Sequence, residues 1–213
     1  MNAIKRLNPD EFWRQAGYGF RKVFVEGPTL SDVLPGGMSA TEIVFTDHLD
    51  ARRLISHHPG DVPYDWRNGI AKGMKALGEE GFYLIGMERE PPLWYVPVEE
   101  INNIYRMHEL RLAHEHFMVS VNGAWAVELT FDWAIMAGTQ PFMSFVDQYA
   151  PSQKETLKQF LDYWEDSGNT GSNVEWISTL FTHLYGREDA KRIIEEMIHT
   201  ESIKARMINA LFS

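Results

Sequence analysis

The strongest constraint on the fold of this 213-residue chain is one dipeptide, Asn122-Gly123, that separates two apolar runs. The first run covers 117–121 and the second covers 124–131, and both contain β-branched or aromatic residues. Asn-Gly between two such runs favours a tight type I′ turn, which matches the twist of paired strands. The sequence therefore predicts a hairpin over 117–131 at the centre of an antiparallel or mixed sheet.

Other elements are predicted before this hairpin. Strand composition on either side of a Pro-Pro pair indicates a strand pair at 82–88 and 93–96. A helix that begins at Asp65 contains Gly69 and Gly73, although glycine is unfavourable inside a helix. We expect these two glycines to mark close packing against a neighbouring element.

The first fifty residues are expected to alternate between helix and strand. Asn8 is a suitable helix cap before Pro9, and Gly17 with Gly19 is expected to end that short helix. Strand composition follows at 20–26. A further helix is predicted from Asp47 through Ser56.

The last third of the chain is predicted to be entirely helical. Ser152 and Glu155 have the spacing of a capping box, and the apolar residues that follow repeat at helical intervals. Two or three more helices are expected between Asn173 and Leu211. The fold class is therefore α+β. We predict a single domain over 1–213, with a possible helical subdomain over 151–213.

Composition and charge exclude several classes of protein. There is no cysteine, which rules out disulfides, zinc-thiolate sites and thiol nucleophiles. The formal net charge of −10 argues against nucleic-acid binding, because phosphate contacts need clustered Lys and Arg. No apolar stretch approaches the roughly 20 residues that cross a bilayer, so no membrane is expected. The first residues lack a secretory signal, so we expect a cytoplasmic protein.

One group of residues has the composition of a metal site. His114 and His116 would lie on one face of a strand, and Glu128 on the partner strand could complete a two-His, one-carboxylate set for a transition metal. His108 could then support the site from outside the ligand shell. These residues define our alternative prediction, a metal-dependent enzyme, although junction residues of ordinary polarity would give the same pattern.

No motif specific to a nucleotide, a cofactor or an activated nucleophile is present, so we predict no cofactor, and enzymatic activity stays an open and less favoured prediction. Pairs of adjacent carboxylates occur at several places. A glycosidase needs two such groups at a defined distance in a cleft, which sequence does not test. The pairs are Glu79-Glu80, Glu99-Glu100, Glu165-Asp166, Glu188-Asp189 and Glu195-Glu196.

Acidic residues concentrate in the second half of the chain. Between 115 and 186 there are nine acids and two lysines, a net charge of −7. A solvated surface would explain this, and so would steering of a basic protein partner. The predicted acidic patch lies near Tyr163 and Trp164. Its members are Glu155, Asp162, Glu165, Asp166 and Glu175.

These features favour a protein-binding protein with a basic partner. In size, acidity, absence of cysteine and richness in aromatic residues the chain is similar in character to bacterial immunity proteins, although no motif assigns it to a family. The resemblance implies an inhibitor that neutralises a basic cognate toxin by covering its active surface. Binding of such a partner should weaken as salt rises.

Overall fold

A computed structural model describes residues 4–23, 45–56, 61–86, 92–106, 115–130 and 132–212. The chain divides into two compact units, one with the described residues up to 152 and one with those from 153 onward. The prediction of one domain with a possible helical subdomain stays a prediction.

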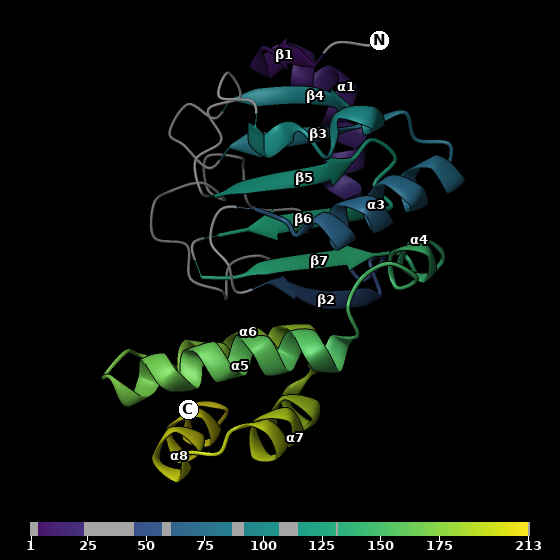
Figure 1. Cartoon of the computed structure of the whole chain (residues 1–213). Helices are drawn as coiled ribbons and strands as arrows, with labels where there is room; N and C mark the ends of the chain where they lie inside the picture. Colours follow the sequence, from purple (N-terminus) through teal and green to yellow (C-terminus); the bar gives the residue numbers. More distant parts are fainter. Residues whose placement is uncertain are drawn as a thin grey trace. The chain divides into compact units, whose positions relative to one another are not determined.

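The first unit is built on one antiparallel sheet (Figure 1). Its strand order is β1-β4-β3-β5-β6-β7-β2, and every neighbouring pair is antiparallel. The predicted α+β class and the predicted strand pair β3–β4 are confirmed. The strands are β1 (Lys5–Leu7), β2 (Ala51–Ser56), β3 (Gly81–Gly86), β4 (Leu93–Pro97), β5 (His116–Ser120), β6 (Trp125–Leu129) and β7 (Ala134–Gly138).

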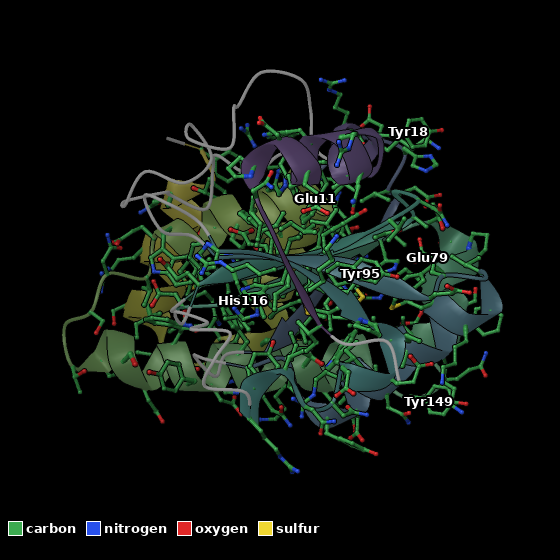
Figure 2. The ribbon with its side chains drawn as sticks, turned by 90° about the horizontal axis from the view of Figure 1, so that it is seen from above. Glu11, Tyr18, Glu79, Tyr95, His116 and Tyr149 are labelled. Atoms are coloured by element: carbon green, nitrogen blue, oxygen red, sulfur yellow. The ribbon has the colours of Figure 1, made fainter. Side chains whose placement is uncertain are left out.

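Helices cover both faces of this sheet, with α1 on one side and α3 on the other (Figures 1 and 2). Phe142, Met143 and Val146 of α4 join the core beneath α3. Close packing at the helix glycines is confirmed, because a Cβ on Gly69 would lie 3.0 Å from the Val146 carbonyl oxygen. The helical segments are α1 (Pro9–Val23), α3 (Tyr64–Ala76), the 3₁₀ turns η1 (Val98–Glu100) and η2 (Ile104–Arg106), and α4 (Gln140–Val146).

The predicted hairpin is confirmed as β5–β6 at the centre of the sheet. Gly123 has φ of +71°, a conformation that glycine adopts without strain. The turn hydrogen bond joins the Gly123 amide to the Ser120 carbonyl, at 3.3 Å. The turn is therefore centred on Val121 and Asn122, one residue earlier than Asn122-Gly123.

The N-terminal helix is longer than its glycines suggest. The Asn8 cap is confirmed, since its Oδ1 accepts a hydrogen bond from the Glu11 amide at 2.8 Å. The helix does not end at Gly17 or Gly19 but continues to Val23, so the strand expected from residue 20 is wrong as far as the structure describes it. Gly19 lies against the hairpin turn, where a Cβ would be 2.5 Å from the Val121 carbonyl oxygen. The glycine allows close approach rather than ending the helix.

The helix predicted from Asp47 through Ser56 is also wrong, because residues 51–56 form the edge strand β2. β2 pairs with β7, and Leu54 and Ile55 are almost fully buried. Pairing with the sheet buries apolar side chains on both sides of this segment, which outweighs its local helix signals.

The second unit consists of helices, as predicted for the C-terminal third. Its core contains aromatic contacts such as Trp164 with Trp176, whose ring centroids are 5.1 Å apart, and Phe160 with Phe181 at 5.9 Å. No helix in the described parts of the chain has the length and apolar character that crossing a membrane requires. The helices are α5 (Gln153–Asn169), α6 (Trp176–Tyr185), α7 (Arg187–Met197) and α8 (Glu201–Ala210).

Candidate functional site

A pocket of about 570 Å³ opens at one end of the sheet in the first unit. Antiparallel pairing of β3 with β4 places Gly81 opposite Pro97, and the Val98 amide donates to the Glu80 carbonyl at 2.9 Å. Two of the adjacent carboxylate pairs therefore meet at this place. The lining residues are Lys75, Gly78, Glu79, Glu80, Val98, Glu99 and Glu100.

The four glutamates have different environments. Glu80 and Glu99 are exposed, and Glu100 is half-buried and accepts a hydrogen bond from Asn103 Nδ2 at 3.0 Å. Within the described residues these three carboxylates have no ion-pair partner, and Lys75 is the one cation that lines the pocket. The pocket is therefore electronegative.

Glu79 is buried and holds the wall of the pocket. Its Oε1 accepts hydrogen bonds from the Ser120 hydroxyl and, at 3.1 Å, from the Asn122 amide. Its Oε2 accepts from Trp125 Nε1 at 2.9 Å. A buried carboxylate with three donors is well solvated by the protein, so Glu79 ties the start of β3 to the β5–β6 turn.

The charges of the pocket act on Tyr95 of β4. The Tyr95 side chain crosses Gly81, where a Cβ would lie 2.6 Å from the Tyr95 hydroxyl oxygen. Burial raises the pKa of Tyr95, and the charges of Glu80 and Glu99 raise it further. The same potential favours a cationic group in the pocket.

The acidic patch predicted on α5 is only partly assembled. Glu155, Asp162 and Asp166 follow one another at seven- and four-residue intervals on the outward side of the helix. Asp162 forms an ion pair with Lys158 one turn earlier. Glu175 lies outside α5 and pairs with Arg206, whose Nε is 2.8 Å from Glu175 Oε1. This pairing lowers the pKa of Glu175.

Glu165 does not belong to an exposed patch, which corrects its predicted role. Its side chain is buried, and Oε1 accepts hydrogen bonds from the backbone amides of His199, at 3.0 Å, and Thr200. These amides lie at the N-terminal end of α8, where a negative charge is favourable. Glu165 therefore fastens α5 to α8.

Replacement of Glu165 by alanine should lower the free energy of unfolding by about 2 kcal/mol, because two partly buried amides lose their acceptor. Its neighbour Asp166 is exposed and provides the control, since Asp166→Ala should change stability by less than about 0.5 kcal/mol. Urea unfolding of both variants measures the difference. Equal effects would contradict the structural role of Glu165.

The predicted metal site is not formed by the residues that the structure describes. Phe117 is directly opposite Glu128, and His116 is directly opposite Leu129. Neighbouring residues of a strand point to opposite faces, so His116 and Glu128 lie on different sides of the sheet and cannot share an ion. His114 and His108 lie outside the described residues, within which no three His, Asp or Glu side chains could hold a metal.

His116 and Glu128 are nevertheless unusual buried polar residues. His116 lies at the end of the sheet away from Glu79, and its Nε2 is 3.1 Å from the Tyr105 hydroxyl (Figure 2). Burial raises the pKa of Glu128 to about 8. The Trp133 side chain lowers this pKa, and the negative charge of Glu115 raises it. Glu128 Oε1 has no hydrogen-bond partner among the described residues.

Neither a family model, nor a curated protein, nor a solved structure matches this chain. The candidate site therefore rests on geometry alone. A signal for it was present in the sequence, because Glu79-Glu80 precedes and Glu99-Glu100 follows the predicted strand pair. Antiparallel pairing brings the start of one strand next to the end of the other.

Proposed function

We propose that this chain is a protein-binding protein whose partner inserts a lysine or arginine side chain into the carboxylate pocket. The observation that carries the proposal is the concentration of Glu80, Glu99 and Glu100 around one concave site, with the charges of Glu80 and Glu99 also acting on Tyr95. Charge complementarity of this kind speeds association and selects a basic partner.

The proposed partner class is a basic toxin, which the chain would neutralise as an inhibitor or immunity protein. The acidity of the whole chain supports this idea, because a net charge of −10 attracts a cationic protein from a distance. The outward carboxylates of α5, Glu155, Asp162 and Asp166, are a second surface for the same kind of partner. The pocket is the stronger candidate, since its three carboxylates have no ion pair within the described part of the chain.

The test is affinity capture from the source lysate with two tagged proteins. One is the wild-type chain, and the other is a triple variant that combines Glu80→Gln, Glu99→Gln and Glu100→Gln. A basic protein held by the pocket should be retained about tenfold less by the variant. The control changes three exposed glutamates of α7 to glutamine, at positions 188, 195 and 196, so that the net charge is the same.

The two variants distinguish binding at the pocket from binding that depends only on the overall negative charge. If both lose the partner equally, the overall charge and not the pocket is responsible, and the proposed site is wrong. A partner lost only by the pocket variant identifies the site. Co-expression of that partner with and without this chain then tests neutralisation, since a toxin should arrest growth only when the chain is absent or carries the pocket variant.

A further inference from the structure

The outward side of α1 carries two arginines around an exposed tyrosine. Arg14, Tyr18 and Arg21 recur at four- and three-residue intervals and therefore form one stripe. All three are exposed, Tyr18 with 68% of its surface accessible, and Tyr18 points away from the sheet (Figure 2). Trp13 beside the stripe is 38% exposed, and Lys22 Nζ is 4.5 Å from the Tyr18 ring centroid.

This stripe is cationic on a strongly acidic chain. Residues 5–22 contain five basic and two acidic side chains, whereas the whole chain has a net charge of −10. Neither Arg14 nor Arg21 has an ion-pair partner within the described residues. Arginine, tyrosine and tryptophan are the residue types that contribute most to protein interfaces. The stripe therefore has the composition of a surface that suits an anionic helix face or segment.

A complementary surface is present on the same chain. Glu155 and Asp162 on the outward side of α5 are seven residues apart, as are Arg14 and Arg21 on α1. With a rise of about 1.5 Å per residue, each pair spans about 10 Å along its helix. Lys158 lies between these two acids and pairs with Asp162, so Asp162 exchanges this exposed ion pair for one with an α1 arginine in the proposed contact. Two acids on α5 can then face two arginines on α1 at matched spacing.

We infer that the chain associates with a second copy of itself, with the α1 stripe of one copy against the outward α5 face of the next. Such a contact joins two different surfaces, so a dimer keeps the unused α5 face of one copy and the unused α1 stripe of the other, and assembly can continue beyond a dimer. Tyr18 and Trp13 supply apolar contact between the charged pairs. The inference does not depend on the carboxylate pocket.

A copy of the chain is a better occupant than a nucleic acid. A polyanion meets long-range repulsion from the net charge of −10, and the stripe offers two arginines and one lysine against it. A second copy also carries −10, so we expect weak association that depends on the local pairs. Exposed ion pairs are individually weak, which makes paired substitutions necessary to detect the contact.

Sedimentation equilibrium of the full chain at low ionic strength tests the inference, with protein up to about 0.5 mM, the range in which weak contacts populate. Wild type should show a mean mass that rises with concentration above the monomer mass of 24.6 kDa. Arg14→Glu with Arg21→Glu should weaken association about tenfold or more. A wild-type mass that stays at the monomer value over the whole range would overturn the inference.

A matched control removes the effect of net charge. Lys191→Glu with Arg192→Glu on α7 changes the charge by the same amount at a different exposed place, and it should leave association within about twofold of wild type. Equal weakening by both variants would sink the proposed contact.

Exchange of the charges gives the decisive result. A chain with Glu155→Lys and Asp162→Lys alone should fail to self-associate, because both faces are then basic. Adding Arg14→Glu and Arg21→Glu to that chain should restore association, because the two faces are complementary again. Each of the two double variants should also bind the other in a mixture. Absence of restoration in the fourfold variant would show that these helices are not partners.

Discussion

Replacement of Glu79 by alanine should lower the free energy of unfolding by about 3–5 kcal/mol, a large effect for one residue. The reason is that the carboxylate is the acceptor for three donors, and alanine leaves the buried Trp125 indole and the partly buried Asn122 amide without that acceptor. Urea unfolding gives the change as a shift of the midpoint. Glu79→Gln should cost less, because the amide oxygen still accepts part of these bonds.

Glu80 provides a control one residue away. It lines the same pocket but is exposed, so Glu80→Ala should change stability by less than about 0.5 kcal/mol. A Glu79→Ala variant as stable as Glu80→Ala would mean that the hydrogen bonds of Glu79 do not hold the hairpin turn. The same comparison separates structure from recognition, because Glu80 is expected to affect partner binding and Glu79 to affect folding.

Glu128 should make the stability of the chain depend on pH. Its pKa is about 8 in the folded chain and 4.5 in an unfolded one, so the folded state retains a proton that the unfolded state loses. The stabilisation from the neutral acid is fully present below pH 4.5 and is lost as pH rises towards 8. The slope over this window is about −1.4 kcal/mol per pH unit.

The variant Glu128→Gln isolates this contribution, because glutamine has nearly the same shape and does not ionise. At pH 5 the variant and wild type should have nearly the same free energy of unfolding. By pH 8 the variant should be more stable than wild type by about 4 kcal/mol. Urea midpoints at several pH values measure the difference. Glu80→Gln, at an exposed position, should show no such trend, and a constant difference for Glu128→Gln would refute an elevated pKa.

The buried state of Glu128 also bears on the choice between enzyme and binding protein. To bind one metal ion together, Glu128 and His116 would have to lie on the same face of the sheet. The strand register places them on opposite faces. The register therefore argues against a metal ion held jointly by His116 and Glu128, and recognition by the exposed carboxylates of the pocket stays our proposal. The lysate capture with pocket variants remains the test of that proposal.

Local sequence signals predicted the elements that depend on residues near one another in the chain. The hairpin, the strand pair β3–β4, the Asn8 cap and the helix α5 each contain their own turn, cap or periodic apolar face. These signals act through neighbouring backbone groups, so they do not require knowledge of the rest of the fold.

Elements that depend on distant partners were predicted wrongly or missed. Strand β2 carries helix-like signals but is extended because β7 pairs with it. Strand β7 was missed because its sequence, Ala134–Gly138, contains two alanines and a glycine and lacks strand composition. Gly19 resembles a helix end and is instead the place where α1 approaches the hairpin turn.

The roles of the acidic residues were decided in the same way. Composition determined that the chain is acidic and lacks cysteine, and capping and periodic apolar residues predicted an all-helical last third. Only the tertiary structure decided which acidic side chains are available to a partner. Glu79 and Glu165 are not available, because both are buried and accept hydrogen bonds from other groups of the chain. Pairing of β3 with β4 gathered Glu80, Glu99 and Glu100 into one pocket, since strand register, and not sequence distance, sets which side chains meet.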